Sequence, residues 1–186
     1  MFSNSYITFI IICICVLNYI RKYQLAQNEY EDLALQDTGA LLKPFNKKYW
    51  YCLITSGFTH VTITHLLMNL YCMYSLGVYL ERIVGHITFL FLFLGAIVVG
   101  NLFTIFIDPN EVSISCGLSG GIYGLMMFYL FLIIRIYGLY GVMYNQGLLL
   151  TLGINIVMNF LLGVGWKAHL GGAVFGLLFG IVFTII

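Results

Sequence analysis

The chain has 186 residues, of which 61% are hydrophobic and only 8% are charged, and its mean hydropathy is +0.99. A soluble domain has about 25% charged residues to cover its surface, so this composition excludes both a soluble globular protein and a disordered one. A formal net charge of +1 gives no electrostatic support for a nucleic-acid partner. We therefore interpret residues 1–186 as a single domain of a multi-pass membrane protein.

An apolar run opens the chain and predicts a first membrane-spanning helix over residues 4–20. Arg21 and Lys22 follow this run, whereas a signal peptide carries its positive charge before the run, so we expect the helix to be retained. Residues 21–58 then form the only long polar stretch. Their mixed charges are interspersed with leucine and aromatic side chains, a pattern typical of a segment that lies in the membrane interface.

Five further apolar runs predict helices two to six within residues 60–186. The runs are continuous and lack the period-two alternation of membrane strands, so we expect an all-α membrane protein with six transmembrane helices. Their predicted ranges are 60–80, 87–107, 118–137, 147–163 and 168–186. Because successive helices alternate in direction, helices two, four and six all enter the membrane from the side of the interfacial loop.

Polar side chains occur near the entry ends of these three helices, where a bilayer makes them costly unless they serve function or helix contact. His65 and Asn69 share one face of helix two, Ser119 begins helix four and His169 begins helix six. Each has an ordinary structural explanation when taken singly, since a membrane serine usually bonds its own backbone. Because helices two, four and six enter the membrane from the same side, all four residues are nevertheless expected at similar depth. Together they offer a nucleophile, a base and two hydrogen-bond donors.

Glycines accompany both the serine and the last histidine. A Ser–His hydrogen bond of about 2.6–3.2 Å between two helices requires their backbones to approach closely, and small residues at four-residue spacing permit that approach. We therefore expect helices four and six to be in contact, with these glycines supporting the site. The small residues are Gly117, Gly120 and Gly124 around Ser119, and Gly172, Gly176 and Gly180 after His169.

These motifs, taken in chain order, resemble those of the rhomboid intramembrane serine proteases, so that the chain is expected to form a six-helix rhomboid-like bundle. The resemblance extends from about residue 39 to residue 186. Three motifs in the same order on corresponding helices make it specific. They are His65 to Asn69 for HxxxN, Gly117-Leu118-Ser119-Gly120 for GxSG, and His169 with Gly172 and Gly176 for HxxGxxxG; His60 and Tyr123 also match family positions.

The resemblance implies a serine-type endopeptidase that cleaves transmembrane segments of other membrane proteins within the lipid bilayer. Ser119 would be the nucleophile and His169 its general base and later acid. The predicted spans contain no aspartate, so the pair would act as a dyad rather than a triad. Tyr123 would stack on the His169 ring and orient it.

The remaining site residues follow from the same resemblance. Asn69 and His65, together with the backbone N–H of Ser119, would stabilise the oxyanion. His60 would help to retain water for deacylation. Neither a metal nor another cofactor is implied.

The interfacial loop departs from the family pattern. Many members carry a Trp-Arg pair before helix two, and that position falls here on Tyr51 and Cys52. Glu81, which follows helix two, would then lack the usual arginine partner. Lys48 could take its place.

The charge of the loops and the resemblance to the rhomboid family predict opposite orientations of the protein in the membrane. The loops on the side of the site carry most of the lysine and arginine residues, which by the positive-inside rule places them in the cytoplasm. The resemblance instead implies an active site that opens to the extracytoplasmic side of the cell membrane. We follow the resemblance, because long loops of mixed charge obey the charge rule poorly.

Three other functions fit part of the pattern. A rhomboid-like pseudoprotease would bind membrane clients without cutting them, but both Ser119 and His169 are present. A small transporter would need paired carboxylates or broken helices near the bilayer midplane, and the predicted spans contain no Asp or Glu. A metal site built from the histidines would lack the HExxH arrangement.

Overall fold

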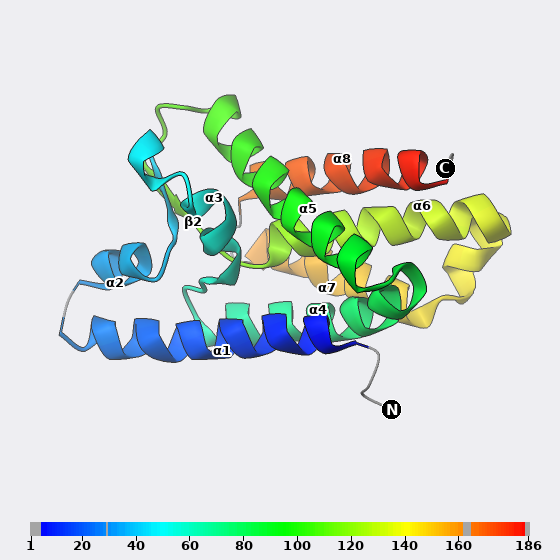
Figure 1. Ribbon diagram of the computed structural model, residues 1–186, viewed down its shortest axis with the longest axis horizontal. Coiled ribbons are helices and arrows are strands. Elements are labelled where there is room, and N and C mark those ends of the chain that lie inside the picture. The colour runs from blue at the N-terminus through cyan, green and yellow to red at the C-terminus, as the bar shows by residue number, and fades with distance from the viewer. Residues whose placement is uncertain (1–4, 29, 162–164, 185–186) are drawn as a thin grey trace.

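The computed structural model describes residues 5–28, 30–161 and 165–184, so residues 4, 29, 162–163 and 185–186 of the expected elements lie outside the described part. Within it, six long helices form the all-α bundle that the sequence predicted (Figure 1). They are α1 (Tyr6–Ala26), α4 (Ile63–Val84), α5 (His86–Ile107), α6 (Ser119–Tyr144), α7 (Gln146–Leu161) and α8 (Trp166–Phe183). By length and composition α1, α5, α6 and α8 could each cross a membrane, and α4 could do so together with the bent segment before it.

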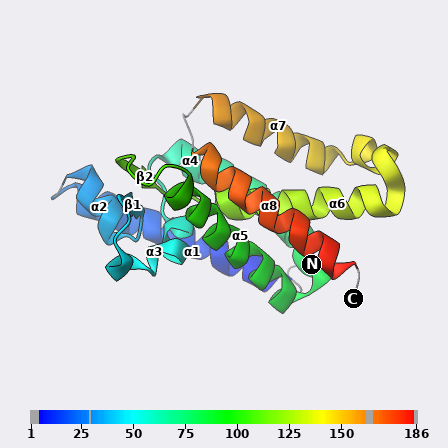
Figure 2. The same cartoon turned by 90° about the horizontal axis from the view of Figure 1, so that it is seen from above.

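The polar segment between α1 and α4 is built from short elements. It contains α2 (Glu31–Asp37), β1 (Leu41–Lys43), α3 (Cys52–Thr55) and two 3₁₀ turns (Lys47–Tyr49 and Ser56–Phe58). Strand β1 pairs antiparallel with β2 (Ser113–Ser115), the strand that leads into α6. Figures 1 and 2 show α2, α3 and the strands at one end of the bundle, opposite the start of α1 and the end of α8. The pairing therefore ties the first loop to the segment before Ser119.

The end of α1 and the start of α4 differ from the prediction for local chemical reasons. Helix α1 continues past residue 20 to Ala26 because Lys22 is buried there and satisfied: its Nζ donates to Glu31 and to the carbonyl oxygen of Val61. Helix α4 begins after residue 60, because the Thr62 hydroxyl accepts a hydrogen bond from the backbone N–H three residues later and caps the helix.

Helix four was expected to end at residue 137, and there the structure has a break rather than an end. Gly138 adopts a positive φ of 64°, a conformation that glycine reaches without steric penalty. The chain then resumes as a short helical segment to Tyr144, which turns away from the axis of α6 (Figure 1).

The core lies between α4, α5 and α6, whereas the outer faces carry many exposed apolar side chains, as expected where lipid is the solvent. Most of the buried side chains in this core are aromatic or aliphatic. The fully buried members include Met73, Leu80, Phe89, Phe93 and Phe128.

Glu81 lies inside α4 rather than beyond it, and its partners correct the expected pairing with Lys48. The Glu81 carboxylate is buried and accepts hydrogen bonds from the backbone N–H of Ile7 (2.9 Å) and from the N–H and hydroxyl of Thr8 (2.8 and 2.7 Å). The ring nitrogen Nδ1 of His86 lies 2.6 Å from it. Lys48 is instead exposed on a 3₁₀ turn. Glu81 thus joins the end of α4 to the start of α1.

Replacing Glu81 by alanine should lower the free energy of unfolding by about 3 kcal/mol, because backbone donors of α1 then lose their buried acceptor. Thermal unfolding in detergent, followed by circular dichroism, measures the loss. The matched control is Asp32→Ala, which removes an exposed carboxylate from α2. Equal melting temperatures for the two variants would contradict an anchoring role for Glu81.

Candidate active site

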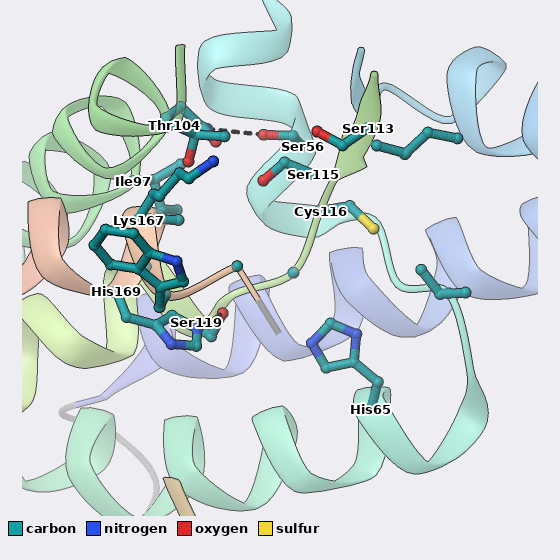
Figure 3. Close-up of a pocket in the computed structure, with 18 of the residues that line it drawn as sticks. Ser56, His65, Ile97, Thr104, Ser113, Ser115, Cys116, Ser119, Lys167 and His169 are labelled. Atoms are coloured by element: carbon teal, nitrogen blue, oxygen red, sulfur yellow. Dashed lines mark hydrogen bonds between the residues drawn. The ribbon is translucent and has the colours of Figure 1, made fainter. Parts of the chain in front are cut away.

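Ser119 and His169 meet where α6 and α8 begin. Ser119 is the first residue of α6, and His169 lies in the first turn of α8. The Nε2 atom of His169 is 2.9 Å from the Oγ atom of Ser119, a hydrogen-bonding distance. The histidine is buried, and both side chains lie at the floor of a cleft (Figure 3). An imidazole so placed can take the proton of the serine hydroxyl.

Helices α6 and α8 approach closely because glycines occupy their crossing. A methyl group added to Gly172 would lie only 2.0 Å from the carbonyl oxygen of Gly120. One turn further, a methyl group on Gly176 would lie 2.0 Å from the carbonyl oxygen of Gly124. Neither position has room for a side chain, so the two backbones are in direct contact just below Ser119 and His169.

The Tyr123 ring stacks on the His169 ring, with centroids 4.3 Å apart and planes inclined by 9°. Its hydroxyl donates to the carbonyl oxygen of Asn155 on α7, at 3.4 Å. The stacked ring restricts rotation of the imidazole and so favours the orientation that points Nε2 at Ser119.

Gly117 brings the loop before Ser119 into contact with α4. Its φ of +120° is one that side-chain-bearing residues rarely adopt. A methyl group there would also lie 2.7 Å from the Cε1 atom of His65. Its N–H donates to the carbonyl oxygen of Ser56 at 2.9 Å, which holds the loop in this position. Only glycine therefore fits between the serine and His65.

Two buried polar side chains of α4 lie beside the serine. His65 and Asn69 line a small hollow together with Ser119 and His169. The Asn69 Nδ2 atom donates to the carbonyl oxygen of His65 at 2.9 Å, and a side-chain amide carries a second N–H. The Nε2 atom of His65 is buried without a hydrogen-bond partner among the described residues. Both groups can donate to negative charge that develops near Ser119.

His60 is fully buried against His65, with ring centroids 5.1 Å apart in an edge-to-face arrangement. It is not among the described residues that line the cleft, so its expected role in retaining water stays a prediction. In residues 5–28, 30–161 and 165–184, no three His, Cys, Asp or Glu side chains are placed to hold a metal ion.

The cleft above Ser119 has a volume of about 390 Å³, and much of its wall is polar. Ser56, Asn101 and Thr104 line it, and Figure 3 labels Ser56 and Thr104. The Asn101 amide donates to the Ser56 hydroxyl at 2.8 Å. Asn101 was not predicted from the sequence, although a lone asparagine in the apolar run of α5 is a usable signal. A polar cleft that begins at the end of the bundle can admit water to the serine.

Charged side chains meet at one wall of this cleft. The Oε2 atom of Glu111 accepts hydrogen bonds from the Nζ atoms of Lys167 and Lys43, each at 2.8 Å. These bonds lower the pKa of Glu111 to about 2, so its carboxylate is ionised throughout the neutral range. This cluster was not predicted from the sequence, because Glu111 is 68 positions from Lys43 and 56 from Lys167.

Comparison with known proteins adds independent evidence. The Rhomboid domain family matches residues 47–185. YdcA of Bacillus subtilis, whose name includes the term rhomboid protease, is 32% identical over 130 residues, covering 69% of this chain and 65% of its own. Rhomboid protease GluP of the same organism is 27% identical over 137 residues, covering 68% and 25%. RHOMBOID-like protein 4 of Arabidopsis thaliana is 32% identical over 183 residues, covering 92% and 45%.

The chain spans less than two thirds of the length of each of these relatives. The matched segment nevertheless extends over well more than half of the chain. It contains α4, α6 and α8, and with them the HxxxN, GxSG and HxxGxxxG motifs. Together with the apolar helices, this match shows that the chain is an integral multi-pass membrane protein and belongs to the rhomboid family.

Proposed function

We propose that this chain is a serine-type intramembrane endopeptidase with Ser119 and His169 as its catalytic dyad. The observation that carries the proposal is the 2.9 Å contact between His169 Nε2 and Ser119 Oγ at the floor of a polar cleft. The term protease in the names of two relatives, YdcA and GluP, supports peptide-bond hydrolysis as the reaction.

In the proposed reaction, Ser119 Oγ attacks the scissile carbonyl carbon while His169 Nε2 accepts the hydroxyl proton. The tetrahedral intermediate collapses when His169 delivers this proton to the leaving amine, which leaves an acyl-enzyme. Water entering through the cleft then gives a proton to His169 and attacks the ester. Loss of Ser119 as the leaving group, protonated again by His169, releases the second product.

The negative charge on the intermediate's oxygen is expected to be met by donors from two helices. The backbone N–H of Ser119 lies at the start of α6, where N–H groups have no partner within the helix. The side chains of Asn69 and His65 approach from α4 and border the same hollow. Donors that are fixed before the reaction favour the charged intermediate over the uncharged substrate.

Asn69→Ala should reduce turnover about tenfold. Loss of an oxyanion donor costs about 10²–10³ where nothing compensates, and here His65 and a backbone N–H remain. Initial rates of peptide cleavage measure the effect, with the extent of fluorophosphonate labelling reporting the folded active fraction. An unchanged rate in the variant that combines Asn69→Ala with His65→Ala would refute the oxyanion role of both.

The proposed substrates are transmembrane segments of other membrane proteins. A helical segment shields its peptide bonds with its own hydrogen bonds, so it must unwind before a carbonyl can reach Ser119. Small or helix-breaking residues near the cleavage site lower the cost of unwinding. We place the protein in the cell membrane with its cleft open to the extracytoplasmic side.

Incubation of the purified protein with a fluorescent transmembrane peptide tests the proposal, with Ser119→Ala as control. Covalent labelling by a fluorophosphonate is measured in parallel, because it reports an activated serine without any substrate. Cleavage and labelling by the wild type alone support the protease. A wild type that binds the peptide but neither cuts it nor reacts would instead be a client-binding rhomboid-like protein.

A further inference from the structure

Glu111 joins three segments that are distant in the sequence. Lys43 ends strand β1, Glu111 precedes strand β2, and Lys167 is the second residue of α8. Both lysine Nζ atoms lie 2.8 Å from the same carboxylate oxygen, Glu111 Oε2. Lys167 Nζ also lies 3.4 Å from Asp108 Oδ2. We call the group of Lys43, Glu111 and Lys167 the clasp.

Within the clasp, Lys43 is the member that holds Glu111 in place. The Lys43 side chain has 0% exposed surface, whereas 41% of the Glu111 side chain is exposed. A buried ammonium group requires a counter-charge, so Glu111 stays bound to Lys43 whether or not Lys167 is present. The paired strands, with Lys43 opposite Ser113, strengthen this half of the clasp. Lys167 is then the member that adds α8 to an already fixed structure.

Lys167 attaches the start of α8 to the clasp by a side-chain hydrogen bond to Glu111. The N-cap residue of α8 is Gly165, and no side chain among the described residues caps this end of the helix. The glycine contact of α8 with α6 lies at Gly172, beyond His169. Lys167 lies two residues before His169, and both Lys167 and Glu111 line the cleft. Before His169, the carbonyl oxygen of Ala168 lies against Gly100 of α5, where an added methyl group would be 2.6 Å away. The clasp adds side-chain hydrogen bonds to this backbone packing and so fixes the first turn of α8.

From these contacts we propose that the clasp positions His169 for proton transfer from Ser119, so that Lys167 and Glu111 are positioning residues of the dyad. They act through the first turn of α8. The inference rests on the proposed function, because it concerns the reactivity of that serine. A displacement of about 1 Å at a catalytic contact can reduce the rate 10²-fold, whereas a partly exposed ion pair such as Lys167–Glu111 contributes little to stability.

The variant Lys167→Met tests the inference, because it keeps the length of the side chain but removes its charge. We expect its rate of fluorophosphonate labelling per folded molecule to fall about tenfold, while its melting temperature stays near that of the wild type. Lys167→Arg should recover most of the rate, since it keeps a cationic donor. Lys47→Met, in an exposed turn of the first loop, is the matched control and should label normally.

Salt provides a second measurement on the unaltered protein. About 1 M salt weakens an ion pair that is partly exposed, as Lys167–Glu111 is, so it should slow labelling of the wild type more than that of Lys167→Met. Labelling of Lys167→Met at the wild-type rate would overturn the clasp, and so would a defect confined to the KM for a transmembrane peptide. If the wild type labels no better than Ser119→Ala, the proposed function itself fails, and the inference falls with it.

Discussion

Ser119→Ala and His169→Ala should each abolish cleavage of a transmembrane peptide, and the variant with both changes should be no less active than either. The expected loss is on the order of 10⁴–10⁶ in turnover. The losses do not add, because a serine without its base and a base without its serine are equally unable to transfer the proton across the 2.9 Å contact.

Initial rates of fluorescent peptide cleavage in detergent provide the measurement, and thermal unfolding shows whether each variant folds. Ser75→Ala is the matched control, because Ser75 lies on α4 and is not among the described residues that line the cleft. Substantial cleavage by Ser119→Ala would refute the assignment of the nucleophile.

Gly172→Val should reduce cleavage by at least about 10²-fold, although residue 172 contacts no reacting atom. A methyl group at this position would lie 2.0 Å from the carbonyl oxygen of Gly120, which belongs to a helix backbone and cannot rotate away. Helices α6 and α8 must then separate. The contact between Ser119 and His169 lies next to this crossing, so the serine would lose its base.

The comparison with Gly180→Val separates loss of activity from loss of stability. A methyl group on Gly180 would lie 2.9 Å from a ring atom of Phe131, a side chain that can move. That site is farther along α8 from His169, so the variant should lose thermal stability but retain cleavage per folded molecule. A wild-type rate per folded molecule for Gly172→Val would show that the dyad does not depend on this helix crossing.

The amino-acid sequence by itself determined the helical bundle and the identity of the candidate dyad. A chain in lipid must satisfy its backbone within each spanning segment, so long apolar runs predict helices without reference to their neighbours. Polar residues in such runs are few because the bilayer makes them costly. Each polar candidate could therefore be identified from the sequence: Ser119, His169, His65 and Asn69. Because alternate helices enter the membrane from the same side, the sequence also predicted a similar depth for all four.

The sequence also predicted contact between α6 and α8, but not which atoms touch. Glycine spacing shows that a helix face is smooth enough for close approach. It does not say how far one helix is shifted along the other. Only the tertiary structure pairs Gly172 with the carbonyl oxygen of Gly120, and that shift sets the distance between Ser119 and His169.

The charged contacts were decided by tertiary structure alone. Glu81 was expected near Lys48 but binds the start of α1, and Glu111 was not expected to bind Lys43 or Lys167. Hydropathy can be calculated from a short window of sequence. The ion-pair or hydrogen-bond partner of a charged side chain depends instead on which residues the tertiary structure places beside it. These partners are 56 to 74 positions apart, and the polar loops that carry several of them have no periodicity from which their paths could be predicted.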